Sequence, residues 1–278
     1  GHDLVLALRL LETGRQQRSR ATLLALLERA DLQATGNLHN VVTAELDEQQ
    51  GRVFARREQR YLDLPLQSAR GGELPPGAAA ESLVPLLAKD PWRWLGEQKD
   101  LRRLLARVAW LRARLPDLDL PAVDDAAVAA ASVLLLGERT DLRALRDADV
   151  AGVLTGGWSH EQRRVLAQFA PDRIELPSGR AAILDYAAPA GPTISARLQE
   201  FFGLPAVGAL AGGRVPVVLE LLAPNHRPVQ VTTDLPSFWR NIYPEVRREL
   251  SRRYPRHSWP EDPLAARPEA RPARRREP

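Results

Sequence analysis

The pattern of apolar and polar residues along the chain predicts helices interleaved with β-hairpins. Apolar residues recur at three- and four-residue intervals in 3–13 and 20–30, which predicts two short amphipathic helices. Residues 38–69 instead alternate apolar and polar side chains across a turn that contains Gly51, as a hairpin does. The glycine- and proline-rich stretch 70–80 then predicts a linker and a domain boundary.

Beyond the linker the same two patterns continue to alternate. Helices are predicted at 81–89, 97–115, about 125–136, 141–154 (two short ones), 159–169, 193–202 and 235–254. Further hairpins are predicted around the turns at 176–180 and 224–228. Helices that alternate with hairpins, rather than with single parallel strands, predict the α+β class with an antiparallel sheet.

Composition narrows the class of protein. At 278 residues the chain is long enough for one large or two modest hydrophobic cores. It has no cysteine, which excludes disulfides and thiolate metal sites. No apolar run approaches the ~20 residues that span a bilayer, so we expect a cytoplasmic protein without a membrane partner. The absence of methionine, in a chain that opens on Gly1, leads us to expect a fragment of a longer protein.

Arginine dominates the basic residues. Lys89 and Lys99 are the two lysines among 39 basic residues, and the net charge is +4. Arginine can bind phosphate through two N–H groups and can stack on bases, whereas lysine cannot. Because a GC-rich genome produces the same preference, the clustering of the arginines is more informative than their number. One cluster forms the polar face of the predicted helix 97–115, where it is either solvated or binds phosphate: Arg102, Arg103, Arg107, Arg112 and Arg114.

No catalytic or metal-binding constellation stands out. The five histidines lack the spacing of a metal-binding pair, and the sequence contains no GxSxG run. The acids within 117–125 could bind Mg²⁺, but a helix N-cap at Asp124 or Asp125 is their plainer role. Gly212 and Gly213 could offer amide groups to a phosphate, although a glycine pair before a strand is more often a turn.

Residues 238–263 mix aromatic and arginine residues most densely. Such a mixture is typical of a surface for single-stranded nucleic acid, but also of a packed amphipathic helix with a basic face. At about 100° per residue, Trp239 and Tyr243 fall on one apolar stripe, so we expect them to be buried while the arginines stay exposed. Pro244 should kink or restart the helix, and Trp259 should pin the end of the segment. The predicted nucleic-acid-binding residues are Arg240, Arg247, Arg248, Arg252, Arg253, Arg256 and His257.

Four segments carry a family resemblance. They are FWRNIYPEVRRELSRRYPRHSWPEDP at 238–263, GRVPVVLELLAPNHRPVQVTTDL at 213–235, LPDLDLPAVDD at 115–125, and the PSG turn with the apolar alternation after it at 177–186. They resemble the C-terminal region of the HrpB family of bacterial DEAH-box ATP-dependent RNA helicases, in the same order. The resemblance covers about residues 37–263.

The resemblance implies an accessory region without a motor. A helicase motor needs a GxxxxGK[ST] phosphate loop, and this sequence contains neither that loop nor a DExH or QRxGRxGR run. The chain is therefore expected to be inactive alone, with ATP and Mg²⁺ bound only by the motor domains. The implied partners are single-stranded RNA, contacted mainly at its phosphates, and the helicase motor domains. The alternative is a docking or regulatory module that packs on the motor or on a partner protein.

The resemblance also implies a division into four parts. These are a short helical segment at 1–36, the end of a helicase helical domain; a β-hairpin or partial OB-like element with its linker at 37–80; an α+β C-terminal domain at 81–263; and a disordered basic tail at 264–278. A complete five-stranded OB barrel does not fit between residues 37 and 80.

Overall fold

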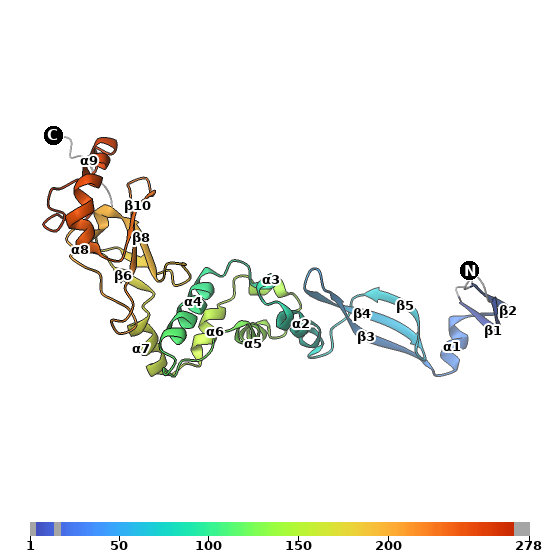
Figure 1. The fold of residues 1–278 in the computed structure, drawn as a ribbon. Helices are drawn as coiled ribbons and strands as arrows, with labels where there is room; N and C mark the ends of the chain where they lie inside the picture. The colour runs from blue at the N-terminus through green and yellow to red at the C-terminus, as the bar shows by residue number, and fades with distance from the viewer. Residues whose placement is uncertain (1–3, 14–17, 270–278) are drawn as a thin grey trace, which may run out of the picture. The chain divides into compact units, whose positions relative to one another are not determined.

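The computed structural model describes residues 4–13 and 18–269, and the chain divides into two compact units (Figure 1). Helices and antiparallel strands occur together, which confirms the α+β class. The first and second units consist of residues 1–95 with 132–146, and of residues 96–131 with 147–278. The first boundary therefore lies after residue 95 and not in the predicted linker at 70–80.

The first unit contains a three-stranded antiparallel sheet. Its strands, in the spatial order β3-β4-β5, are β3 (Leu38–Asp47), β4 (Arg52–Tyr61) and β5 (Leu64–Arg70). The turn between β3 and β4 contains Gly51 at a φ of 63°, and a Cβ atom there would lie 2.4 Å from the Trp94 ring. The predicted hairpin around Gly51 is thus present, with β5 as a third strand.

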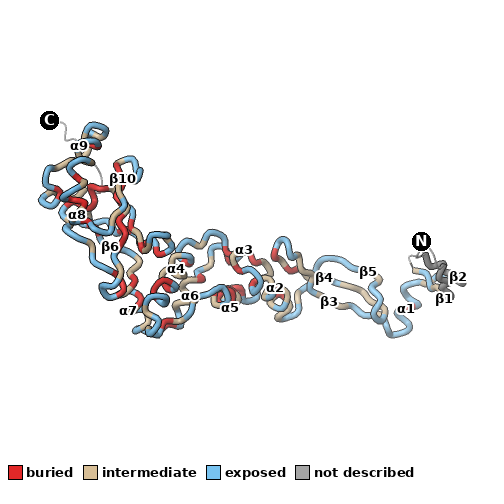
Figure 2. Tube along the Cα trace, viewed as in Figure 1, coloured by how far each residue is buried: buried red, intermediate tan, exposed pale blue. Residues whose placement is uncertain are grey.

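This sheet has almost no core of its own. Along its three strands, all of which are described, Val53 is the one buried residue, and the others are exposed or half-buried (Figure 2). Segment 132–146 returns to the Gly51 end of the sheet, where the Val53 N–H donates to the Thr140 carbonyl at 2.8 Å. Buried side chains of the unit lie instead on the elements beside the sheet: α2 (Ala78–Lys89), α3 (Trp92–Leu95) and the 3₁₀ turn η1 (Leu142–Leu145).

The two helices predicted at 3–13 and 20–30 are wrong. These segments are the antiparallel strands β1 (Leu4–Thr13) and β2 (Arg18–Leu27), with Leu4 opposite Leu27, and helix α1 (Arg29–Ala34) follows them. Short leucine-rich runs fit a strand as well as a helix, so periodicity alone does not separate the two. Pairing decides the outcome, because a ten-residue helix without tertiary support is marginal in water.

The helices between residues 97 and 170 are close to those predicted. Two of them begin at the predicted caps, because the Asp124 carboxylate accepts the Ala127 N–H at 2.9 Å, and Ser159 and Gln162 form the expected capping box. The helices are α4 (Lys99–Arg114), α5 (Asp125–Leu136), α6 (Val150–Gly156) and α7 (His160–Phe169).

The second unit holds a two-stranded and a three-stranded sheet. Both predicted hairpins are present, as β6 (Arg173–Glu175) with β7 (Ala181–Ile183) and as β9 (Val218–Leu222) with β10 (Pro228–Thr232). The helix predicted at 193–202 is wrong in its first half, where strand β8 (Thr193–Arg197) runs parallel to β9. Burial of Ile194 and Ala196 on one face stabilises that strand, and the sheet β10-β9-β8 is mixed rather than antiparallel.

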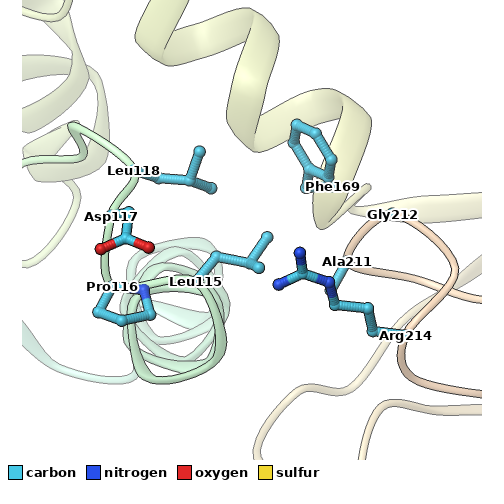
Figure 3. Close-up of a pocket in the computed structure, with 8 residues that line it drawn as sticks. All are labelled: Leu115, Pro116, Asp117, Leu118, Phe169, Ala211, Gly212 and Arg214. Carbon is cyan, nitrogen blue, oxygen red and sulfur yellow. The ribbon is translucent and has the colours of Figure 1, made fainter.

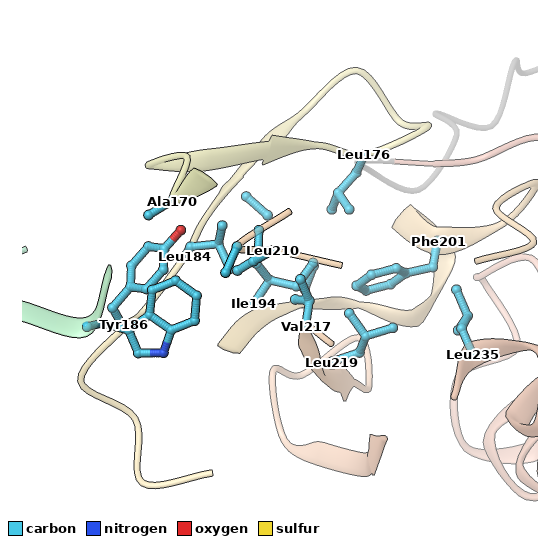
Figure 4. Packing of buried hydrophobic residues seen from close by; sticks show 14 of the residues in the cluster. Ala170, Leu176, Leu184, Tyr186, Ile194, Phe201, Leu210, Val217, Leu219 and Leu235 are labelled. Atoms are coloured by element: carbon cyan, nitrogen blue, oxygen red, sulfur yellow. The ribbon is translucent and has the colours of Figure 1, made fainter. Parts of the chain in front are cut away.

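The C-terminal helix is built in three pieces. Helix α8 (Leu235–Ser237) leads into a π-helical turn (Phe238–Ile242) and then into α9 (Tyr243–Arg253). Pro244 occupies the first turn of α9, where its missing N–H has no intrahelical partner to lose, so the helix restarts there as predicted. Beneath these pieces Ile194, Phe201 and Leu235 belong to one apolar core (Figure 4).

The disordered tail predicted at 264–278 begins too early. The carbonyl of buried Pro263 accepts the Gly203 N–H at 2.9 Å, and the Glu269 N–H donates to the Gln199 carbonyl at 3.0 Å. Residues 264–269 are therefore tied to the domain by main-chain hydrogen bonds. The rest of that prediction, at 270–278, lies outside the described residues.

Candidate nucleic-acid interface

The aromatic side chains of the C-terminal segment form a buried cluster, as their helical phase predicted. Trp239 and Tyr243 are 5% and 1% exposed, and their rings stand 5.3 Å apart in an edge-to-face arrangement. The Trp239 indole N–H donates to the Leu204 carbonyl at 2.9 Å, and the Tyr243 hydroxyl donates to the Pro260 carbonyl at 2.8 Å. With both polar tips satisfied inside the fold, these rings are not available to stack on bases.

Trp259 closes the segment, also as predicted. Its indole N–H donates to the Tyr254 carbonyl at 2.9 Å, and its own carbonyl accepts the Arg247 Nε–H at 2.8 Å. Arg247 also pairs with Glu261 at 3.1 Å. Arg247, one of the predicted RNA-binding residues, therefore has its hydrogen-bond partners inside the fold.

Five other arginines of this region are exposed, and we call them the C-terminal arginine set: Arg240, Arg248, Arg252, Arg253 and Arg256. Arg248 and Arg252 lie one turn apart on α9. Arg253 stands 5.7 Å from the Tyr254 ring, and the Arg248 Nε–H makes a long bond of 3.3 Å to the Pro244 carbonyl. Among the described residues, no carboxylate forms an ion pair with any member of the set. The set thus presents positive charge that the fold itself does not neutralise.

His257 contributes differently from its arginine neighbours. Its ring is half-buried and lies edge-on to the Tyr254 ring at 6.3 Å. Burial, and secondarily the positive charge of Arg197, lowers the pKa of His257 below its ordinary value of 6.5. The ring is therefore mainly neutral at pH 7 and adds no charge to the predicted surface.

Two arginines of α4 donate to main-chain carbonyls of other segments. The half-buried Arg107 guanidinium donates to the carbonyls of Ala170 and Leu166, and burial lowers the pKa of Arg107. Arg112 donates to the Leu120 carbonyl. In α7, the Arg163 guanidinium donates to three carbonyls at and just after the end of α6, at 2.8–3.1 Å. Among the arginines that donate to main-chain carbonyls of another segment, we call these four the structural arginines: Arg93, Arg107, Arg112 and Arg163.

A cavity of about 370 Å³ in the second unit was not foreseen as a site. Figure 3 shows Arg214 reaching toward Leu115 from one side, with Asp117 on the other. The walls are apolar side chains and backbone from the end of α4, the end of α7 and the turn before β9: Leu115, Pro116, Leu118, Phe169, Ala211 and Gly212. No local sequence signal could have found this cavity, because Asp117 and Arg214 are far apart in the chain and only the fold brings them to the same cavity.

The other candidate sites have structural roles. The Gly213 N–H donates to the Leu210 carbonyl at 3.1 Å, as a turn requires, so that amide is not available to a phosphate. Asp124 caps α5, and Asp119 accepts a bond from the Gln162 side chain at 3.3 Å. Within the described ranges 4–13 and 18–269, no three His, Asp or Glu side chains gather where they could hold a metal ion. No helix in that part of the chain is long and apolar enough to cross a membrane.

Comparisons with known proteins place the second half of the chain. A family model described as the ATP-dependent helicase C-terminal domain of HrpB matches residues 133–263. This match covers just under half of the chain. Over 185 residues, 64% of this chain, the sequence is 40% identical to the ATP-dependent RNA helicase HrpB of Escherichia coli strain K12.

Two solved structures agree with this assignment over nearly the whole chain. The crystal structure of the E. coli DExH-box NTPase HrpB matches 95% of the chain with a TM-score of 0.64 at 28% identity. The crystal structure of the Escherichia coli DEAH/RHA helicase HrpB matches 92% with a TM-score of 0.56 at 27% identity. The chain spans 22% of the length of the curated HrpB sequence and about a third of each solved HrpB chain. The predicted resemblance to the HrpB C-terminal region is thus confirmed.

Proposed function

We propose that this chain is a non-catalytic accessory region of an HrpB-type helicase and contributes RNA binding through the C-terminal arginine set. The observation that carries the proposal is the contrast within one segment: Trp239 and Tyr243 are sealed in the core, while the set is exposed and unpaired among the described residues. Guanidinium groups suit phosphate oxygens because they donate two parallel N–H bonds. ATP and Mg²⁺ belong, in this proposal, to the motor domains and not to this chain.

The expected contact is mainly with the phosphate backbone. Aromatic platforms would make binding depend on stacking, which salt affects little, but the aromatic residues here face inward. Phosphate contacts release counterions, so affinity should fall steeply as salt rises. His257, neutral at pH 7, should not contribute to this salt dependence.

Fluorescence anisotropy with a labelled twelve-nucleotide oligouridine, from low to physiological salt, tests the proposal. We expect binding at low salt that weakens by at least tenfold across the series, as several phosphate contacts require. Absence of binding at low salt, or an affinity that does not change with salt, would overturn it. Arg227→Ala is the matched control for substitutions in the C-terminal arginine set, because Arg227 is an exposed arginine of the same unit that lies at the β9–β10 turn.

A second candidate function, docking on the motor domains, rests on the β1–β2 hairpin. Val5, Leu24 and Leu26 are 52%, 60% and 64% exposed, and the register places Val5 opposite Leu26 on one face of the pair. Uncovered apolar side chains on a sheet face are typical of a protein contact. If docking is the function, Leu24→Ser with Leu26→Ser releases the motor domains in a pull-down, and charge reversal of the exposed Arg248 and Arg252 leaves RNA affinity unchanged.

A further inference from the structure

The cavity between Asp117 and Arg214 is formed by elements that hydrogen bonds hold in place. The Ala211 N–H donates to the Phe169 carbonyl at 2.9 Å, which joins the turn before β9 to the end of α7. Arg107 joins the end of α7 to α4 through the carbonyls of Leu166 and Ala170. The three walls of the cavity therefore keep their positions without a ligand, as most small-molecule sites do.

The two charged side chains at the cavity are available to a ligand. Asp117 and Arg214 are both exposed, and within the described part of the chain neither forms an ion pair or a side-chain hydrogen bond. Both the partly negative carbonyl end of α4 and Asp117 oppose an anion in the cavity. A free phosphate would meet Arg214 but also this negative side, so the favoured ligand is uncharged and has N–H donors on one edge and acceptors on the opposite one.

The walls add a requirement for a flat, apolar body. Phe169 is half-buried and presents its ring to the cavity, with Leu115 and Leu118 on the neighbouring wall. Gly212 has a φ of 68°, and a Cβ atom there would lie 3.3 Å from the Phe169 ring, so the backbone approaches that ring closely. At about 370 Å³ the cavity is large enough for a single nucleobase.

We propose that this cavity binds one unpaired guanine base of RNA. Guanine carries adjacent N1–H and N2–H donors that a carboxylate can accept together, while its O6 and N7 acceptors suit a guanidinium. Asp117 would accept the N1–H and N2–H bonds, Arg214 would donate to the O6 and N7 side, and Phe169 would pack against the ring. Adenine has no adjacent pair of donors, and cytosine and uracil lack the acceptors of the purine N7 edge.

This inference rests on the proposed RNA binding but can be tested apart from it. The first probe is a twelve-nucleotide oligouridine with a single central guanosine, compared with oligouridine alone by fluorescence anisotropy. We expect the guanosine to tighten binding about tenfold, as one well-placed bidentate contact does. The second probe is free guanosine 5′-monophosphate, observed by saturation-transfer NMR beside the adenosine, cytidine and uridine 5′-monophosphates, and the guanosine compound should give the strongest signal.

Substitutions in the cavity should remove the preference for guanosine without removing RNA binding. Asp117→Asn and Arg214→Gln lie on the surface and should fold normally, and each should reduce the preference to less than about twofold. Affinity for oligouridine should change little in Asp117→Asn, because phosphates do not contact this carboxylate. The matched controls are Asp147→Asn and Arg227→Ala, exposed residues of the same unit that do not line the cavity.

The outcomes separate this inference from the proposed function. If oligouridine binds and the central guanosine adds nothing, the cavity inference fails while the RNA-binding proposal stands. If no RNA binds but guanosine 5′-monophosphate still does so selectively, the RNA-binding proposal fails and the cavity remains a guanine site. Equal binding of adenosine and guanosine, or a preference that survives Asp117→Asn, would also overturn the assignment of guanine.

Discussion

Arg107 of α4 and Arg252 of α9 carry the same guanidinium group but lie in different environments. Arg107 is half-buried and donates to two carbonyls at the end of α7, whereas Arg252 is exposed and has no ion pair among the described residues. Both helices are amphipathic with a basic face, so the sequence pattern alone does not separate them. In this fold an arginine stabilises the structure when its guanidinium group reaches carbonyls of another segment, and it is available to a ligand when it has no such partner.

The acceptors that engage arginine here lie at helix ends and turns. The last carbonyls of a helix lack intrahelical partners, and the guanidinium group offers five N–H donors in a planar fork. Arg163 meets this need at the end of α6, and Arg93 meets it at the β3–β4 turn through the carbonyls of Glu48 and Gln49. An arginine-rich composition can therefore stabilise a fold without indicating a nucleic-acid partner.

The largest expected effect concerns a buried carboxylate that engages two arginines. Glu200 is fully buried and pairs with Arg180 at 2.9 Å and with Arg197 at 3.5 Å. Glu200→Ala removes the partner of both cations and should lower the free energy of unfolding by about 3–5 kcal/mol in urea denaturation. Glu249→Ala, on the exposed side of α9, should change it by less than about 0.5 kcal/mol. Equal effects of the two substitutions would show that the buried pair does not stabilise the fold.

Removal of a structural arginine should lower the free energy of unfolding less than Glu200→Ala does. It should lower it more than removal of a member of the C-terminal arginine set. Arg107→Ala leaves the carbonyls of Leu166 and Ala170 without their donor inside the fold, so the free energy of unfolding should fall by about 2–3 kcal/mol. Affinity for oligouridine in the remaining folded protein should be unchanged. If Arg107→Ala instead lost RNA affinity and kept its full stability, Arg107 would be an RNA-binding residue and not a structural arginine.

Charge reversal in the C-terminal arginine set should have the converse result. Arg248→Glu with Arg252→Glu should weaken binding of oligouridine by at least about tenfold at low salt, because two attractive phosphate contacts become repulsive. The free energy of unfolding should change by less than about 0.5 kcal/mol, since both side chains are exposed. Anisotropy and urea denaturation on the same sample measure both quantities, and a marked loss of stability would show that these arginines also serve the fold.

The smallest expected effect is a pH dependence that comes from His257. Burial, and secondarily Arg197, lowers its pKa in the folded state, so the unfolded chain binds the proton more readily. The contribution of this group to stability is therefore complete above pH 6.5 and is lost progressively as the pH falls toward the lowered value. His257→Gln should flatten the fall in stability between pH 6.5 and pH 5, measured as thermal midpoints. A fall as steep as that of the unchanged protein would exclude His257 as its source.

The sequence was sufficient to predict those features that depend only on residues within one element. The helical phase of Trp239 and Tyr243, the capping box at Ser159 and the restart at Pro244 depend on residues within a few positions of one another. Strand β8 and the pair β1–β2 depend on distant partners, so their segments were predicted as helices. A prediction from local periodicity fails where long-range pairing decides between two structures that the same residues allow.

The residues of the candidate site also differ in whether the sequence alone could predict their roles. The C-terminal arginine set could be found by sequence, because exposure follows from helical phase. The roles of Arg107 and Arg247 could not, since each depends on carbonyl groups from a segment that only the fold brings near. The cavity between Asp117 and Arg214 is the extreme case, because its two charged residues lie on different elements far apart in the chain.

The slope of log affinity against log salt concentration is the decisive measurement for phosphate binding by the C-terminal arginine set. It should be measured for oligouridine with the unchanged chain and with the triple variant Arg248→Ala, Arg252→Ala and Arg256→Ala. We expect the triple variant to reduce the magnitude of the slope by about 2, since each lost phosphate contact on a single strand contributes about 0.7. An unchanged slope, with RNA still bound, would show that phosphate binding lies elsewhere and would contradict the account.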